Sequence, residues 1–274
     1  SFSTPEVVMS FSANGLNALS QNFHKIVKNR VCRGAYRDAR RPVLLNLWEA
    51  CYFNFTDETI KKAADSAADL GVELLVIDDG WFGKRDIDTC SLGDWTVNTN
   101  KLPNGLNGLS DKLNSMGMKF GLWIEPEMVN PDSDLYRAHP EWAIGVPNRE
   151  SSLCRNQLVL DLSNNEVCDY IINVVSDVLS SANIEYVKWD MNRNMSQFGS
   201  AGLPADRQKE MPHRYMLGLY SILEDIISNN PDVLFEGCSG GGGRFDPGML
   251  YYMPQIWTSD DTDAVERLYI QYGT

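Results

Sequence analysis

The 274-residue sequence has few histidines and no CxxC motif, which disfavours a metal site. None of its histidines lies four residues from another, the spacing that zinc-binding helices use. The three are His24, His139 and His213. Six cysteines are spread along the chain, a distribution typical of reduced core thiols rather than of a disulfide framework. We therefore expect a cytoplasmic protein without a metal or cofactor.

Basic residues and long hydrophobic runs are also scarce. Lys and Arg number 24 against 37 Asp and Glu, a net charge of −13, whereas nucleic acids and anionic membranes require a basic face. No run approaches the ~18 to 20 apolar residues that span a bilayer. The N-terminal SFSTPEVVMS lacks the basic and apolar regions of a signal peptide. We expect neither nucleic acid nor a membrane as a partner.

Glycine motifs for nucleotide binding are missing as well. No GxGxxG or GxxxxGK[ST] follows the first apolar run, which removes the main signal for a nucleotide site. The stretch GCSGGGGR at 237–244 is rich in glycine but has no P-loop lysine, so phosphate binding there is disfavoured.

Six short, nearly continuous apolar runs are the main structural signal, and they are typical of strands buried on both faces of a parallel sheet. Helical patterns separate most of them, the first with Thr56 as the expected N-cap. This alternation favours a parallel α/β architecture, either an open doubly wound sheet or a (β/α)8 barrel. The runs are 43–48, 72–77, 119–124, 184–189, 233–237 and 254–259, and the helical patterns are 56–71, 106–117, 165–183 and 213–230.

Every apolar run ends in carboxylates or tryptophan. Barrel enzymes assemble their active sites at this end of the strands. Tryptophan beside carboxylates indicates sugar binding, because pyranose rings present apolar faces and hydroxyls that carboxylates accept from. Each residue alone also has an ordinary interpretation as a turn, cap, core or ion-pair residue, but their shared position favours a site. They are Trp48-Glu49, Asp78-Asp79, Trp123 with Glu125, Lys188 with Asp190, Glu236 with Cys238, and Asp260-Asp261.

Two of these carboxylates suit glycoside hydrolysis, which needs two carboxyl groups flanking the scissile bond. Asp190 follows the fourth run, and Asp260 and Asp261 follow the sixth, so we expect them to face each other across a barrel mouth. Lys188 lies on the same side of its strand as Asp190 and would favour the ionised form that a nucleophile needs. Crowding of acids would favour a proton on Asp260 or Asp261, and the residues leave open which one.

The motifs LLVIDDGWFG, GLWIEPEMV, YVKWDMNR, FEGCSGGGGRFDPGMLYYMPQIWTSDDTDA and ERLYIQYGT together resemble glycoside hydrolase family 36, the α-galactosidases of the bacterial type. The resemblance runs from about Pro42 to the last residue. It implies a retaining, double-displacement hydrolase that removes terminal α-1,6-linked galactose from raffinose, stachyose, melibiose and related glycans. An oligosaccharide with terminal α-galactose is therefore the expected partner.

The resemblance also implies roles for individual residues. Asp190 matches the nucleophile, and the acid/base falls in WTSDD, with Asp260 favoured and Asp261 kept open. Asp78 and Asp79 match the residues that hold the 4- and 6-hydroxyls of galactose. Other positions match the lining of the sugar subsite: Trp48, Trp123, Arg155, Lys188, Asn192, Cys238 and Gly240.

Length is where the chain departs from the family, whose members carry β-rich domains on both sides of the barrel and usually assemble as oligomers. We expect a piece of a longer, homo-oligomeric enzyme. Residues 1–41 would form a linker segment with a helix over about 12–30. Residues 42–274 would form an incomplete (β/α)8 TIM-type barrel of about six strand–helix units, because strands seven and eight are not identifiable. Whether these residues alone are active is left open.

Three alternatives stay open on the sequence. The first is a related retaining α-glycosidase for α-glucosides, α-xylosides or N-acetylgalactosaminides. A comparison of nitrophenyl glycosides would separate these, because the Asp78-Asp79 pair should favour an axial 4-hydroxyl. The second is a galactosyl transferase. The third is a non-catalytic sugar-binding fragment, which would need neither Asp190 nor the SDD run.

Overall fold

The computed structural model describes residues 4–273 and contains a six-stranded parallel sheet. Every predicted run contributes one strand. Chain order and sheet order coincide, as in a (β/α)8 barrel and unlike a doubly wound sheet, in which the order reverses. The strands are β1 (Leu44–Asn46), β2 (Leu74–Ile77), β3 (Lys119–Ile124), β6 (Tyr186–Trp189), β7 (Leu234–Gly237) and β8 (Gln255–Ile256).

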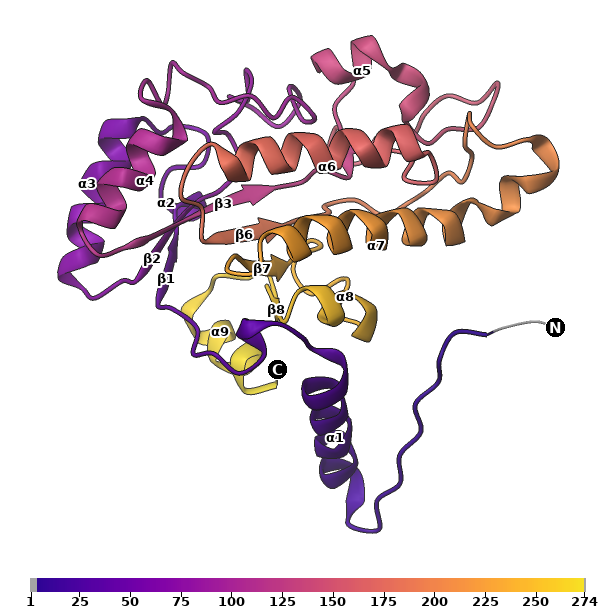
Figure 1. Cartoon of the computed structure of the whole chain (residues 1–274), viewed down its shortest axis with the longest axis horizontal. Helices are drawn as coiled ribbons and strands as arrows, with labels where there is room; N and C mark the ends of the chain where they lie inside the picture. The colour runs from indigo at the N-terminus through magenta and orange to yellow at the C-terminus, as the bar shows by residue number, and fades with distance from the viewer. Residues whose placement is uncertain (1–3, 274) are drawn as a thin grey trace.

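The four predicted helices connect successive strands and pack on the outside of the sheet (Figure 1). Thr56 caps the first as expected: its Oγ1 accepts a hydrogen bond from the Thr59 backbone N at 3.3 Å, and Thr59 Oγ1 accepts one from Thr56 N at 2.8 Å. The last begins at Met211 rather than at His213. The helices are α3 (Asp57–Asp69), α4 (Gly105–Ser115), α6 (Asn165–Ser180) and α7 (Met211–Asn229).

The pattern missed several short elements, because a few residues cannot display a periodicity. The outer strands β1 and β8, which have one neighbour each in the described sheet, are also shorter than the runs 43–48 and 254–259. The short elements are the antiparallel pair β4 (Met128–Val129) and β5 (Leu158–Val159), the helices α2 (Trp48–Cys51), α5 (Asp134–Ala138) and α8 (Pro247–Tyr252), and the 3₁₀ turns η2 (Ala35–Arg37), η3 (Pro140–Trp142) and η4 (Ala205–Glu210). The longer helix α9 (Ala264–Gly273) was missed as well, whereas the π-helical η1 (Val27–Val31) lies at the end of the helix expected over about 12–30.

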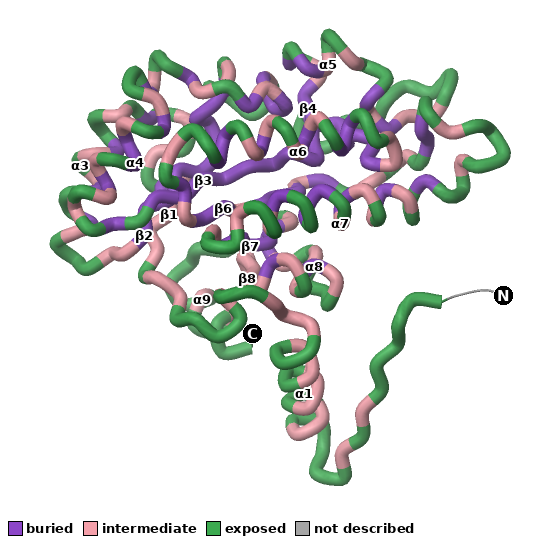
Figure 2. Tube along the Cα trace, viewed as in Figure 1, coloured by how far each residue is buried: buried purple, intermediate pink, exposed green. Residues whose placement is uncertain are grey.

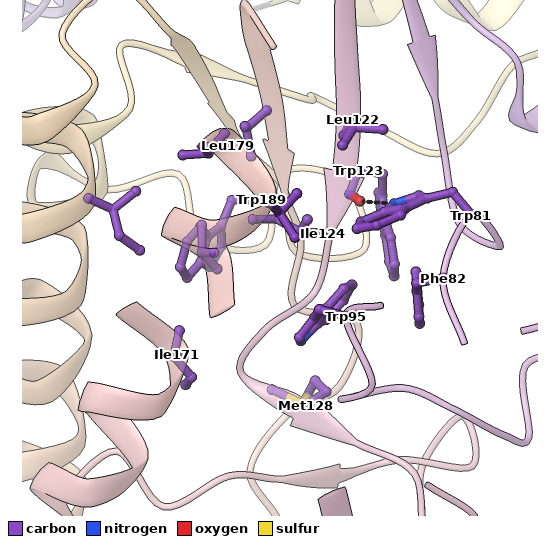
Figure 3. Close-up of a cluster of buried hydrophobic side chains, with 14 of the residues drawn as sticks. Trp81, Phe82, Trp95, Leu122, Trp123, Ile124, Met128, Ile171, Leu179 and Trp189 are labelled. Carbon is purple, nitrogen blue, oxygen red and sulfur yellow. Dashed lines mark hydrogen bonds between the residues drawn. The ribbon is translucent and has the colours of Figure 1, made fainter. Parts of the chain in front are cut away.

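An aromatic cluster extends the core beyond the ends of β2 and β3. Trp81, Phe82, Trp95 and Trp123 are buried and contact one another, with 4.4 Å between the ring centroids of Phe82 and Trp95. Trp81 Nε1 donates to the Trp123 carbonyl at 2.9 Å (Figure 3). Close aromatic packing contributes beyond the area that it buries, so this cluster fixes the loops that lead into the strand ends.

The sheet is open: in the residues that the structure describes, β8 and β1 are not hydrogen-bonded to each other. Its six strands in barrel order confirm the expected incomplete (β/α)8 barrel. The helix α1 (Gly15–Ile26) projects away from the sheet and has no buried residue (Figures 1 and 2). The division into segments 1–41 and 42–274 stays a prediction. Across residues 4–273, no helix combines the length and the apolar character needed to cross a membrane.

Candidate active site

The carboxyl ends of the strands surround a pocket of about 570 Å³, a volume typical of small-molecule sites. Most residues predicted for the site line it. Cys238 is buried, Gly240 and Asp261 are exposed, and these three lie outside the lining. The predicted residues that line the pocket are Trp48, Asp78, Asp79, Trp123, Arg155, Lys188, Asp190, Asn192 and Asp260.

Asp190 follows β6 and is held by three hydrogen-bond donors. Its Oδ2 accepts from Trp123 Nε1 at 2.9 Å and from Asn192 Nδ2 at 2.6 Å, and its Oδ1 accepts from Met191 N at 2.8 Å. Donors aimed at a carboxylate fix its direction. Cys238 lies close by, and burial followed by the charge of Asp190 raises the pKa of its thiol, so Cys238 is a neutral neighbour.

Lys188 forms its ion pair with Asp78 rather than with Asp190. Its Nζ lies 3.2 Å from Asp78 Oδ2, an oxygen that also accepts from Asn46 Nδ2 at 2.6 Å. Although burial lowers the pKa of Lys188, the charges of Asp78 and Asp190 raise it above the ordinary value. The ammonium therefore stays charged between the two carboxylates. Asn46 of β1 also lines the pocket, and the sequence did not predict it as a site residue.

Asp79 is paired with Arg85, which the sequence did not indicate. Arg85 Nε and Nη2 donate to Asp79 Oδ1 and Oδ2 at 2.9 and 2.8 Å. Arg85 is 1% exposed, and its Nη1 donates to Asn130 Oδ1 at 2.8 Å. Burial raises the pKa of Asp79, and Arg85 opposes that shift. Arg85 follows the DDGW motif in an irregular loop, where spacing could not predict the direction of its side chain.

Glu125 lies at the end of β3 and lines the pocket while fully buried. Its Oε2 accepts from Gln157 Nε2 at 2.9 Å, and its Oε1 accepts from the backbone N of Asn192. Burial, and then the charge of Asp190, raise the pKa of Glu125 to about 8. The sequence placed this acid at a strand end without a role, because its burial arises only when the strand-end loops pack together.

Asp260 and Asp261 differ in what they face. Asp260 lines the pocket, and its Oδ1 accepts from Trp257 Nε1 at 2.8 Å. The Oδ1 of Asp261 instead accepts from the backbone N of Asp263 at 3.0 Å. Trp257 also lies over Lys188, with 5.4 Å from Nζ to the ring centroid. One pocket thus holds the carboxylates of Asp190 and Asp260, as expected for the two runs on which they lie.

Two ion pairs lie in this pocket, Lys188 with Asp78 and Arg85 with Asp79. Within the described part of the chain, no group of three or more His, Cys, Asp or Glu side chains is arranged to hold a metal ion. The described lining offers carboxylates aligned by indole, amide and ammonium donors.

Comparison with known proteins finds a matching family model and relatives that are named α-galactosidases. The sequence model of the Melibiase family matches residues 1–274. The chain is 63% identical over its full length to α-galactosidase AgaA of Geobacillus stearothermophilus and 52% identical to α-galactosidase Mel36A of Lactobacillus acidophilus. It spans 38% and 37% of the lengths of these relatives.

Solved structures point to the same family. The crystal structure of the GH36 enzyme AgaA superposes with a TM-score of 0.93 at 62% identity, over 96% of this chain and 36% of that one. Variants of AgaA have been solved in complex with stachyose and with raffinose. Sequence, strand order and the geometry of the pocket lead to one assignment: this chain belongs to the Melibiase family, GH36.

Proposed function

We propose that the protein carrying this chain is a retaining α-galactosidase that hydrolyses terminal α-1,6-linked galactose by double displacement. The observation that carries the proposal is that the carboxylates of Asp190 and Asp260 line one sugar-sized pocket, with the first held by three donors. Substrates of the raffinose and melibiose type are proposed by analogy with the complexes of the AgaA variants.

In the first step, Asp190 attacks the anomeric carbon, and Asp260 protonates the leaving oxygen. The indole of Trp123 and the amide of Asn192 hold the attacking carboxylate, so little reorganisation is needed. In the second step, water attacks the galactosyl ester and Asp260 takes its proton, which releases galactose with its configuration retained. Asp260 is preferred to Asp261 as the acid/base because it lines the pocket.

Recognition of galactose is assigned to the paired carboxylates beside the nucleophile. Asp78 and Asp79 line the pocket and are held by Lys188 and Arg85. Carboxylates fixed in this way accept hydrogen bonds from sugar hydroxyls, and we assign them to the 4- and 6-hydroxyls. Trp48 and Trp257 also line the pocket, and indole rings suit the apolar face of a pyranose.

The first test is release of nitrophenol from p-nitrophenyl α-galactoside, with the α-glucoside as the epimeric control. The full-length protein that carries this sequence should prefer the galactoside, and Asp190→Ala should abolish turnover. Sodium azide should then restore turnover and give β-galactosyl azide, because azide attacks from the face that the missing carboxylate vacates. Activity that survives Asp190→Ala, or an α-configured azide product, would contradict the role of Asp190.

A second comparison separates the two candidate acids. Nitrophenol leaves readily without a proton, whereas the sugar leaving group of raffinose needs one. Asp260→Ala should therefore lose far more activity on raffinose than on the nitrophenyl substrate, and Asp261→Ala should change both substrates by similar factors. The reverse pattern would move the acid/base role to Asp261.

The proposed compartment is the cytoplasm. All six cysteines lie within the described residues and are free thiols, as a reducing compartment maintains them. Homo-oligomer formation stays a prediction.

A further inference from the structure

Two glutamates just beyond β3 are fully buried but have different partners. Glu125 and Glu127 are each 0% exposed. Glu127 faces a cation: Arg244 Nη1 and Nη2 donate to it at 3.1 and 2.8 Å. Trp189 Nε1 and Tyr215 Oη also donate to it, at 2.9 and 2.6 Å. The buried carboxylate of Glu127 is therefore paired with a cation and with two further donors.

Glu125 is held by neutral groups. The side-chain amide of Gln157 and the backbone N–H of Asn192 are its hydrogen-bond partners. An ionised Glu125 would place a further negative charge in a buried carboxylate cluster, at a cost that no hydrogen-bonded cation offsets. The titratable groups whose charges act on it are Asp190, Asp79 and the exposed Arg155.

Asn192 links Glu125 to the nucleophile. Its backbone N–H donates to Glu125, while its side-chain Nδ2 donates to Asp190 Oδ2 at 2.6 Å. The direction of the Asn192 side-chain amide therefore depends on both carboxyl groups, because Glu125 holds the backbone and Asp190 accepts from Nδ2. Displacement of the backbone at Asn192 would rotate the donor away from Asp190.

We propose that Glu125 is a positioning residue that fixes Asn192, and through it Asp190, and that it does so as a neutral carboxylic acid. The role in turnover rests on the proposed function.

The surroundings of Gln157 agree with a proton on Glu125. Gln157 Oε1 is buried and has no hydrogen-bond partner among the described residues. A half-turn of the Gln157 amide presents this oxygen to Glu125, whose O–H can then donate to it. The raised pKa of Glu125, which follows from burial and from Asp190, points the same way.

The test compares three variants of the full-length protein. Glu125→Gln keeps the size, neutrality and hydrogen-bonding capacity of the protonated acid, so it should retain most of the wild-type kcat and melting temperature. Glu125→Ala leaves Asn192 N without its acceptor, and kcat should fall by about 10²-fold with little change in KM. Glu127→Gln is the matched control: it leaves Arg244 buried without its anionic partner, and the melting temperature should fall.

Infrared spectroscopy reports the proton directly. The wild-type minus Glu125→Gln spectrum at about pH 6 should contain the carbonyl stretch of a protonated carboxylic acid, and it should be replaced by a carboxylate band above about pH 8. A carboxylate band at the lower pH, or a Glu125→Gln variant as inactive as Glu125→Ala, would overturn the neutral-acid assignment. An active Glu125→Ala enzyme would overturn the positioning role.

These readouts separate the two proposals. A wild-type protein that hydrolyses no α-galactoside would refute the proposed function and, with it, the role of Glu125 in turnover. The infrared titration and the melting comparison with Glu127→Gln need no substrate, so they decide the protonation of Glu125 in either case.

Discussion

At the scale of single residues, the site depends on which donor reaches which carboxylate. Trp123 is both a core residue, 2% exposed, and the indole donor to Asp190. Lys188 and Arg85 hold one carboxylate each, Asp78 and Asp79. Asp78 and Asp79 are thus held by cations, whereas Asp190 is oriented by neutral N–H donors.

Trp123→Phe should weaken catalysis more than folding. The substitution keeps an aromatic ring in the cluster but removes the indole donor, and a hydrogen bond to a charged group contributes about 1.5–3 kcal/mol. We expect kcat to fall about 10- to 100-fold, with a small change in KM. Trp95→Phe is the control, since Trp95 packs against Trp123 but does not line the pocket. Equal losses of kcat in the two variants would contradict a specific role for the indole donor.

At the scale of elements, parallel register brings the strand ends together. Trp123 in β3 pairs with Lys188 in β6, and Lys188 pairs with Glu236 in β7. Side chains one or two residues further along each strand therefore meet at one rim, which places Glu125 beside Asp190. The helices hold this register from outside, and the contact between α7 and the segment before α6 is especially close.

Gly218→Ala tests that contact. A Cβ on Gly218 of α7 would lie 1.9 Å from the Leu162 carbonyl oxygen and 3.1 Å from Cys168 Sγ, so α7 must shift. Overpacking of this kind costs about 1–3 kcal/mol, and we expect a lower melting temperature. Ser221→Ala, at an exposed position of the same helix, should leave the melting temperature unchanged. A Gly218→Ala protein as stable as the wild type would show that α7 can move freely.

At the scale of the whole molecule, acidity is the dominant property. The net charge is −13, and several acids are buried at the strand ends. Burial raises the pKa values of Glu125, Asp79 and Glu236. A carboxyl group whose pKa is higher in the folded state binds protons on folding, so its contribution to stability is complete at low pH and decreases as the pH rises.

Glu125 should therefore produce a pH-dependent difference in stability between the wild type and Glu125→Gln. Its pKa rises from 4.5 to about 8 on folding. Across this interval the wild type should lose stability relative to the variant, by up to about 1.4 kcal/mol per pH unit. The difference should be constant below and above the interval. Denaturant unfolding over a pH series measures it, and parallel curves for the two proteins would contradict the raised pKa.

Most of the secondary structure could be predicted from the sequence, because it depends on local patterns. Each apolar run contains a strand, and the four helical patterns are helices, with Thr56 at the expected cap. The runs also predicted that acids would gather at one rim, since parallel strands share the direction of their ends. Elements of a few residues were missed because they display no periodicity, and the exact ends of the strands were not predicted.

The sequence by itself determined the strands, the parallel α/β architecture that their alternation favours, and the acids at the strand ends, all of which follow from residue type and spacing. Only the tertiary structure decided the partners: Lys188 with Asp78, Asp79 with Arg85, and Glu125 with the backbone of Asn192. These contacts depend on strand register and on loops that join distant segments. The charge state of a buried acid depends in turn on those contacts, because a carboxylate without water is stabilised only by the groups that tertiary packing brings to it.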